Sequence, residues 1–193
     1  MGAFLLSVQY GNNVEGPIRL ALTGSPGTGK TSVCSLLSEI GLEVVSMEML
    51  AEEYDCIGDA DTMDGARPID MASLCSRLED DWIARPPTNT MVDGHLSHLL
   101  PVDCVIIMRC KPVVLKERLV ERGYSNEKIS QNVDWEILGG TWSELGEGVP
   151  VIEFDSSSDS SDSIVESIMS WIVDGLKPER PANQIDWVGR GEV

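Results

Sequence analysis

The sequence of 193 residues predicts an α/β fold in which a parallel sheet of five strands is flanked by helices. Short apolar segments alternate with longer segments of helical periodicity, which is the pattern of β-α-β units. A glycine-rich loop at residues 24–31 joins the first of these strands to the first helix. The segment 102–109 is almost continuously apolar, and this indicates a strand buried on both faces.

The first predicted strand and helix lie on either side of the glycine-rich loop. Residues 18–23 are short and mostly apolar, as in a buried parallel strand. Residues 30–39 contain neither proline nor glycine, and their apolar side chains recur at helical spacing. Strand, loop and helix in this order form the context that a phosphate-binding loop requires.

The remaining elements follow from shorter patterns along the chain. We expect further strands at 42–46, 90–93, 102–109 and 149–154, and helices at 71–82, 112–121, from about 127 onward, and at 164–173. Pro112 suits the first turn of its helix. The run of Ser and Asp at 155–162 can cap the last helix, so we do not interpret it as a linker.

The chain divides into one domain with a segment on each side. We expect an N-terminal extension at residues 1–17, a single α/β domain at 18–176 and a C-terminal tail at 177–193. The tail contains two prolines and two glycines, which are turn and loop residues. The sequence leaves open whether the tail folds back onto the domain.

The glycine-rich loop Gly24-Ser25-Pro26-Gly27-Thr28-Gly29-Lys30-Thr31 matches the pattern G-x-x-x-x-G-K-[ST]. Glycines allow the backbone to approach an anion closely, and successive N–H groups then point at it from a helix N-terminus. Lys30 would reach the β- and γ-phosphates of a nucleotide, and the Thr31 hydroxyl would bind Mg²⁺. The alternative is a turn in which Lys and Thr stand by chance, but the flanking strand and helix favour phosphate binding.

Asp93 ends an apolar strand, which is the Walker B position that holds Mg²⁺ directly or through water. Ligands of parallel sheets bind at the carboxyl ends of strands, so Asp93 and the loop predict one site. His95 either orients a water or an attacking group, or simply caps and packs, and the sequence favours neither role. We interpret His98 as a structural residue.

Positive charges gather in one part of this acidic chain. Six of the 14 basic residues lie within twenty positions: Arg109, Lys111, Lys116, Arg118, Arg122 and Lys128. Arg118 and Arg122 are four residues apart and share a helix face. Arginines on a lid would bring charge to a transferring phosphoryl group and exclude water. A solvated helix face is the alternative, since glutamates stand between them.

Composition excludes several classes of function. The formal net charge is −18, from 32 acidic and 14 basic residues, so we expect no binding of free DNA by the general surface. Five cysteines form no C-x-x-C pair, and we expect reduced, buried thiols in a cytoplasmic protein. We also expect no signal peptide and no membrane-spanning segment.

Three stretches together resemble the adenylate kinase isoenzyme 6-like family, in particular its archaeal branch. They are ALTGSPGTGKTS, MVDGHLSHLLPVDCVIIMRC and ERLVERGYSNEKISQNVDWE, in the order and spacing of the family. The combination of D-G-H with a later R-G-Y is more specific than the phosphate loop alone. The resemblance covers about residues 18–175 and implies a P-loop nucleoside monophosphate kinase fold. It also implies a monophosphate-binding region at 46–67 and a short, zinc-free lid at 121–131.

The resemblance also implies roles for individual residues. The phosphate contacts to ATP would be Gly27, Gly29, Lys30, Thr31 and Ser32. Asp93 and His95 would form the D-x-H element, with Thr31 and Asp93 at Mg²⁺. Arg122 would be a lid arginine that contacts ATP, with Arg118 as its companion. Lys30, Asp93, His95, Arg118 and Arg122 would therefore form the catalytic set.

The acceptor region departs from the family pattern. Eleven acidic residues lie between Glu48 and Asp81, and Arg67 and Arg77 are the basic residues there. The resemblance implies the reaction ATP + AMP ⇌ 2 ADP and a role in maturation of small-subunit ribosomal RNA, through a basic ribosomal protein or a pre-ribosome. A ribosome-assembly ATPase with minor AMP kinase activity is the alternative. A kinase for another small acceptor, such as a sugar or a cofactor precursor, is a third possibility.

Overall fold

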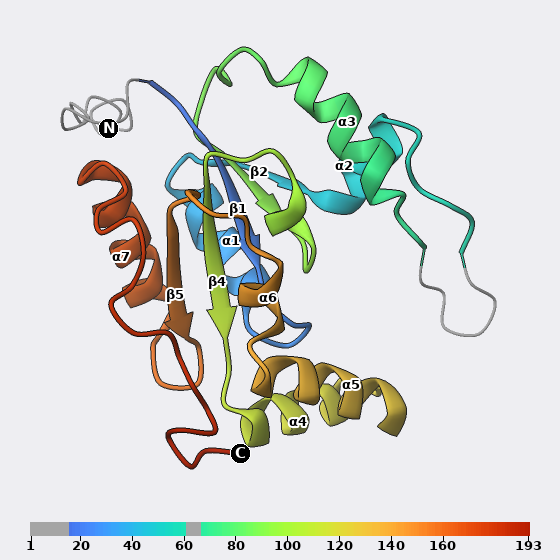
Figure 1. Ribbon diagram of the computed structural model, residues 1–193, viewed down its shortest axis with the longest axis vertical. Helices are drawn as coiled ribbons and strands as arrows, with labels where there is room; N and C mark the ends of the chain where they lie inside the picture. The colour runs from blue at the N-terminus through green and yellow to red at the C-terminus, as the bar shows by residue number, and fades with distance from the viewer. Residues whose placement is uncertain (1–15, 61–66) are drawn as a thin grey trace.

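Five parallel strands form the sheet at the centre of the computed structural model, which describes residues 16–60 and 67–193 (Figure 1). The strand order is β2-β3-β1-β4-β5. The strands are β1 (Arg19–Thr23), β2 (Glu43–Ser46), β3 (Thr90–Asp93), β4 (Cys104–Arg109) and β5 (Val151–Asp155). This topology confirms the predicted fold class and places β1, which leads into the glycine-rich loop, in the middle of the sheet.

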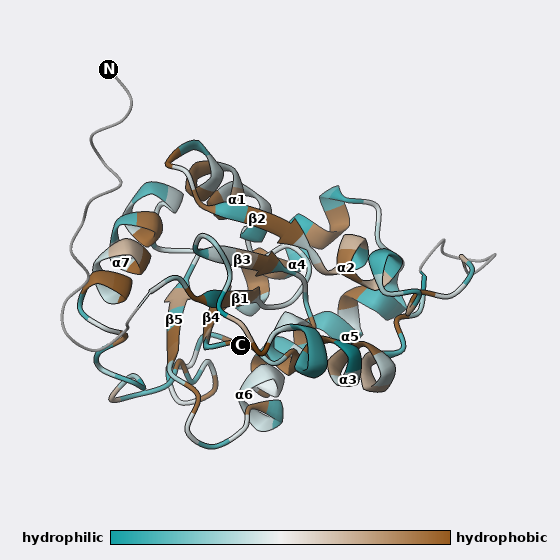
Figure 2. Cartoon of the chain, turned by 90° about the horizontal axis from the view of Figure 1, so that it is seen from above, coloured by the Kyte–Doolittle hydropathy of each residue, from teal (hydrophilic) through white to brown (hydrophobic). Residues whose placement is uncertain are grey.

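Helices cover both faces of the sheet. They are α1 (Lys30–Glu39), α2 (Met47–Glu53), α3 (Met71–Asp81), α4 (Pro112–Glu121), α5 (Asn126–Ile137), α6 (Gly140–Glu144) and α7 (Ser161–Val173), with a short 3₁₀ turn, η1 (Ser97–Leu99). Figure 2 shows α1 and α7 on one side of the strands and α6 on the other. Helices α4 and α5 pack against each other beyond the carboxyl end of β4.

Alternate residues of the central strand bury against opposite layers, as a strand covered on both faces requires. Leu20 and Leu22 of β1 pack with α1 and α7 in the largest apolar cluster. Ala21, between them, belongs to a separate cluster with Val105 and Ile107 of β4 on the other face. The sheet is therefore rigidly held at the point where β1 enters the loop.

Several predicted boundaries agree with the structure to the residue, and others miss short elements. The segments 30–39, 90–93 and 112–121 are α1, β3 and α4. Ser160 caps α7 by accepting a hydrogen bond from the Ser163 backbone at 3.2 Å, which confirms the capping role of the Ser- and Asp-rich run. The sequence analysis does not predict α2, α6 or η1, which span only seven, five and three residues.

The C-terminal tail folds onto the domain, which answers the question that the sequence left open. Trp187 is completely buried. The backbone N–H of Val151, at the start of β5, donates to the carbonyl of Glu179 at 2.7 Å. Of the proposed segments, residues 1–15 of the N-terminal extension and residues 61–66 of the monophosphate-binding region lie outside the described residues.

Candidate active site

The glycine-rich loop has a backbone that only glycine adopts without strain. Gly24, Gly27 and Gly29 have φ values of +133°, +90° and +89°. A Cβ atom on Gly24 would lie 2.2 Å from the carbonyl oxygen of Met108, on the neighbouring strand β4. The loop is therefore packed against the sheet and leads directly into the N-terminus of α1, where anions bind to backbone N–H groups.

The Lys30 side chain folds back over this loop. Its Nζ donates hydrogen bonds to the carbonyl oxygens of Gly24 at 2.7 Å and Ser25 at 3.1 Å. Burial lowers the pKa of the ammonium to about 8, although the nearby Asp93 carboxylate opposes that shift. A partly desolvated ammonium group poised above a phosphate-binding loop has a strong electrostatic preference for an anion.

Asp93 faces the first turns of α1 from the end of β3. Its pKa is raised by burial, against the opposing effects of Lys30 and a hydrogen bond from the Cys34 thiol. The Oδ1 atom is buried and has no hydrogen-bond partner among the described residues. A carboxylate oxygen without a partner, beside the phosphate loop, fits a ligand of Mg²⁺ or of its bound water.

One pocket of about 300 Å³ opens between the start of the loop and α5. It is lined by Gly24, Ser25, Pro26, His95, Leu96, Gln131, Asn132, Trp135 and Glu144. Desolvation and the positive charge of Lys30 lower the pKa of His95, so its imidazole is neutral at neutral pH. A neutral imidazole can accept a proton or a hydrogen bond from a group in this pocket.

A second pocket, of about 220 Å³, lies at the other end of the loop. Its lining combines loop residues with both predicted lid arginines: Gly27, Gly29, Ser32, Met108, Arg118, Arg122, Ser156, Asp159 and Ser161. Arg118 donates to the carbonyl of Gly27 at 3.1 Å and to that of Ser156 at 3.0 Å. Arg118 thus fastens the loop to the segment after β5, and the guanidinium groups of Arg118 and Arg122 both line this polar pocket.

The basic residues at 109–128 have different roles, and two of them, outside the predicted lid at 121–131, are engaged in ion pairs. Arg109 is buried and pairs with Glu136 at 2.6 Å and Glu153 at 3.2 Å. Lys111 pairs with Glu192 of the tail at 2.8 Å. Both residues are neutralised by carboxylates from segments distant in sequence, Arg109 in the interior and Lys111 at the surface.

Glu136 is a residue of the site region that sequence reasoning missed. It lies in α5, only 3 % exposed, and accepts hydrogen bonds from the Ser25 hydroxyl at 3.3 Å and the Cys110 backbone at 3.3 Å. The Trp187 indole donates to it at 2.9 Å. Its partners are 26 to 111 residues away along the chain, so no local pattern marks it.

His98 is structural, as expected. Its Nδ1 atom lies 2.8 Å from the Thr23 hydroxyl, and its Nε2 atom lies 3.0 Å from the Glu144 carboxylate. Burial lowers the pKa of the imidazole, while the Glu144 carboxylate acts in the opposite direction. The side chain therefore ties the end of β1 to α6.

The two arginines of the acceptor region are engaged by their neighbours. Arg67 pairs with Glu52 and lies 3.7 Å from Glu48. Arg77 donates to the backbone carbonyl of Tyr54. Arg67 is therefore neutralised by glutamates of α2, whereas Arg77 of α3 is held by a backbone carbonyl.

Comparison with known proteins identifies the family. The model of the AAA domain family matches residues 20–139, which include the phosphate loop and Asp93. An archaeal protein of Pyrococcus abyssi described as "Putative adenylate kinase" is 39% identical over 170 residues, which cover 87% of this chain and 90% of the relative. The chain belongs to this family of archaeal adenylate kinase-like proteins. A relative of the same description from Archaeoglobus fulgidus is 38% identical over 90% of this chain and 93% of its own length.

Solved structures support the same fold for this member of the family. A shikimate kinase from Acinetobacter baumannii in complex with shikimate aligns with a TM-score of 0.55 and 12% identity, over 83% of this chain and 95% of that one. A sugar kinase from Janibacter aligns with a TM-score of 0.51 and 15% identity, over 83% and 98%. At such identities the likeness shows a P-loop kinase fold and no substrate. None of the helices in the described part of the chain is long and apolar enough to cross a membrane.

Proposed function

We propose that the protein transfers the γ-phosphoryl group of ATP to AMP, forming two molecules of ADP. The observation that carries the proposal is the buried, unpartnered Oδ1 of Asp93 beside Lys30 at the phosphate loop. A carboxylate in that position would bind Mg²⁺, directly or through water, once the metal ion and nucleotide phosphates occupy the loop. The archaeal relatives, each described as "Putative adenylate kinase", support the same activity.

The residues of the loop would bind and orient ATP. Backbone N–H groups at Gly27 and Gly29 would surround the phosphates, with Lys30 neutralising the β- and γ-phosphate oxygens. The Ser32 side chain, which lines the second pocket, would add a hydrogen bond. Thr31 and Asp93 would hold Mg²⁺, which supplies charge neutralisation when bound.

Two arginines would stabilise the transition state of this reaction. Arg118 and Arg122 line the pocket beside Gly27, where their positive charges would stabilise the negative charge on the transferring phosphoryl group. The transfer would run in line from ATP to the acceptor, with no covalent intermediate on the protein. The lid would be residues 121–131, and closure would exclude water.

The acceptor would lie between the His95 pocket and the monophosphate-binding region at 46–67. Neutral His95 would accept a hydrogen bond from the attacking group or from a water beside it. The amides of Gln131 and Asn132 also line that pocket and could bind a polar acceptor.

A second candidate function is a ribosome-assembly ATPase in small-subunit ribosomal RNA maturation. Arg67 is paired with glutamates and Arg77 is held by the Tyr54 carbonyl, so neither guanidinium is positioned solely for an acceptor phosphate. In that case His95 would position a water molecule. The net charge of −18 would suit a basic ribosomal protein as partner. The compartment would be the cytoplasm, which suits the five free cysteines.

The test is ADP formation from ATP and Mg²⁺, with and without AMP. Lys30→Ala should reduce the AMP-dependent rate by at least about 100-fold, because an electrostatic contact to the transferring phosphates is lost. His95→Ala should reduce it more modestly, by about 10-fold or more. Lys116→Ala is the matched control, since Lys116 is exposed on α4 away from both pockets at the loop, and it should leave the rate unchanged.

The outcomes separate the two candidate functions. An AMP-dependent rate that disappears in Lys30→Ala supports the kinase. A slow rate that AMP does not change, but that both Lys30→Ala and His95→Ala abolish, supports the ATPase. A wild-type rate in Lys30→Ala would contradict both.

A further inference from the structure

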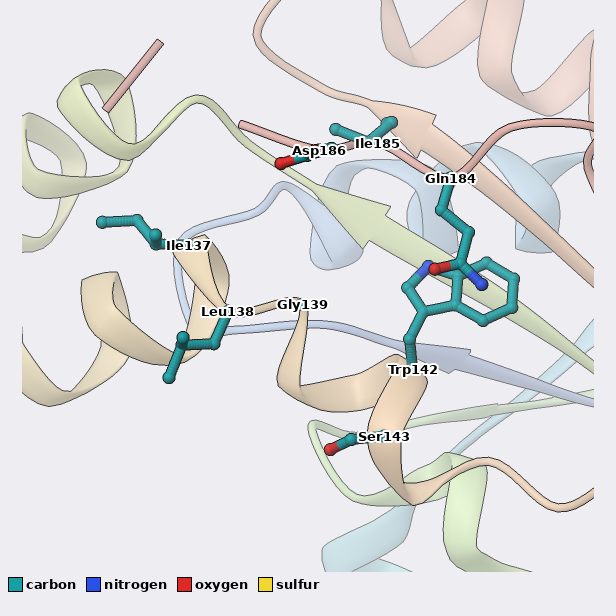
Figure 3. Close-up of a pocket in the computed structure, with 8 residues that line it drawn as sticks. All are labelled: Ile137, Leu138, Gly139, Trp142, Ser143, Gln184, Ile185 and Asp186. Carbon is teal, nitrogen blue, oxygen red and sulfur yellow. The ribbon is translucent and has the colours of Figure 1, made fainter. Parts of the chain in front are cut away.

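The C-terminal tail touches the domain at a few points and spans an open cleft between them. It runs from α7 past the end of β5 toward α4 (Figure 1). A cleft of about 450 Å³ separates it from the corner between α5 and α6 (Figure 3). The cleft is lined by Ile137, Leu138, Gly139, Trp142, Ser143, Gln184, Ile185 and Asp186. The tail contacts the domain before the cleft through Pro178 and Glu179, and at its far side through Ile185 and Trp187.

Trp187 reaches the interior beside two ionised partners. Its ring is completely buried, and the Arg109 guanidinium lies over it at 5.7 Å. Its indole N–H donates to Glu136 Oε1 at 2.9 Å. The Glu136 side chain is as buried as the core around it, with 3 % exposed.

The buried charges need the donors that the tail supplies. Two carboxylates, Glu136 and Glu153, pair with the single guanidinium of Arg109. Among the described residues, the further donors to these two carboxylates include the Trp187 indole and the Ile185 backbone N–H, which lies 2.6 Å from Glu153. A buried carboxylate that loses a donor is destabilised and tends to move toward another one.

Glu136 connects this cluster to the phosphate loop. Its second oxygen, Oε2, accepts a hydrogen bond from the Ser25 hydroxyl at 3.3 Å. Ser25 is the residue after Gly24, and its carbonyl oxygen also accepts from Lys30. One carboxylate thus bridges the tail at Oε1 and the loop at Oε2, while Arg109 Nε at 2.6 Å and the Cys110 backbone N–H at 3.3 Å also donate to Oε1.

We propose that Trp187 is a positioning residue for the phosphate-binding loop, acting through Glu136 on Ser25. The tail thereby sets the loop geometry that nucleotide phosphates meet. The inference rests on the proposed function only in that the loop must bind ATP. Neither the loop motif nor the tail sequence shows this link, because it exists only in the folded chain.

The test compares two buried tryptophans in the full-length protein. Trp187→Phe keeps an aromatic ring and removes the N–H that Glu136 accepts. Trp171→Phe is the matched control, because the Trp171 ring is 3 % exposed and its N–H donates to the Pro178 carbonyl at 3.0 Å. This variant removes a hydrogen bond at the start of the tail but keeps the one from Trp187 to Glu136. Trp187→Phe should raise the Kd and KM for ATP by about three- to tenfold, with a smaller change in kcat, while Trp171→Phe changes neither. If the two variants bind ATP with equal Kd, the proposal is wrong, because equal values are expected when both tryptophans contribute only to folding.

A double-mutant cycle with Ser25→Ala tests the path directly. Ser25→Ala removes the donor on the loop side, so Ser25→Ala and Trp187→Phe should be non-additive in the Kd for ATP, with the double variant close to the weaker single one. Strict additivity would overturn the route through Glu136. If Trp187→Phe does not fold, an unchanged Kd in Ser25→Ala would overturn it equally.

Lys30→Ala separates this inference from the proposed function. If Lys30→Ala retains wild-type ATP binding, the loop is not the ATP site and the proposed function fails. If Lys30→Ala loses ATP binding while Trp187→Phe keeps it, the function stands and the positioning role fails.

Discussion

The two histidines of the chain, three residues apart, have different environments that no spacing rule could assign. His95 is exposed to the pocket at the phosphate loop, whereas His98 is buried between Thr23 and Glu144. The pKa of each is lowered, in both cases chiefly by desolvation. The same side chain thus occupies two settings: His95 lines a pocket at the loop, and His98 holds β1 against α6.

The buried His98 should make the stability of the protein pH-dependent. Its pKa lies below the usual value in the folded state, so the unfolded chain binds more protons as the pH falls below about 6.5. This contribution to stability is therefore complete above that pH and is lost below it. His98→Gln, whose amide can still contact Thr23 and Glu144, should show a shallower fall in unfolding free energy between pH 7.5 and 5.5, by up to about 1.4 kcal/mol per unit of pKa difference. Denaturant unfolding at several pH values measures it, and parallel curves for the two proteins would contradict the assignment.

Residues of the loop could be predicted from the sequence, whereas the residues that support the loop could not. Lys30 and Asp93 stand in local patterns that carry their own chemistry. Arg109 follows an apolar strand within a cluster of cations, and nothing in that local context predicts its buried ion pairs. Its actual partners, Glu136 and Glu153, lie 27 and 44 residues further on, and only the folded chain brings them together.

At the scale of elements, the predictions hold where a segment is long or sharply bounded. Helix α1 is bounded by the glycine-rich loop, and α4 begins at Pro112, so their limits follow from residue chemistry. Helices α2 and α6 are too short for apolar periodicity to develop. Helix α6 also begins with Gly140, which is a poor helix former. A Cβ atom at this position would lie 2.1 Å from the Trp135 ring, so packing requires a glycine here.

The cap of α7 gives a prediction at the same scale. Ser160→Ala should lower the unfolding free energy by about 1 kcal/mol, because the N–H of Ser163 loses its acceptor. Ser167→Ala, at an exposed position within the same helix, should be neutral or slightly stabilising. Thermal unfolding of both variants checks the prediction. Equal stability of the two would show that the cap contributes nothing, and ATP binding should be unchanged in both.

For the whole molecule, the charge of the surface is the dominant property. The net charge of −18 is spread over 193 residues, and α2 and α3 together carry six of the 32 acidic side chains. Such a surface repels itself in the folded state, and added salt screens the repulsion. The ion pairs that matter most to the fold, at Arg109, are buried and are screened much less.

Salt should therefore stabilise this protein. The midpoint of thermal unfolding should rise by several degrees as NaCl increases from about 0.05 to about 1 M, because the Debye length shortens from over 10 Å to about 3 Å. An uncharged solute at the same osmolarity is the control and should produce a smaller shift. A midpoint that falls with salt would mean that surface ion pairs contribute more than the repulsion does.

The tail also has a consequence for how copies of this chain behave toward one another. Strand β5 is at the edge of the sheet, and the carbonyl of Glu179 accepts the hydrogen bond of Val151 N–H on it. An uncovered edge strand offers its free N–H and C=O groups to a strand of another molecule, which is a common start of aggregation. By occupying the beginning of that edge, the start of the tail leaves less of β5 available for pairing with a strand of another molecule.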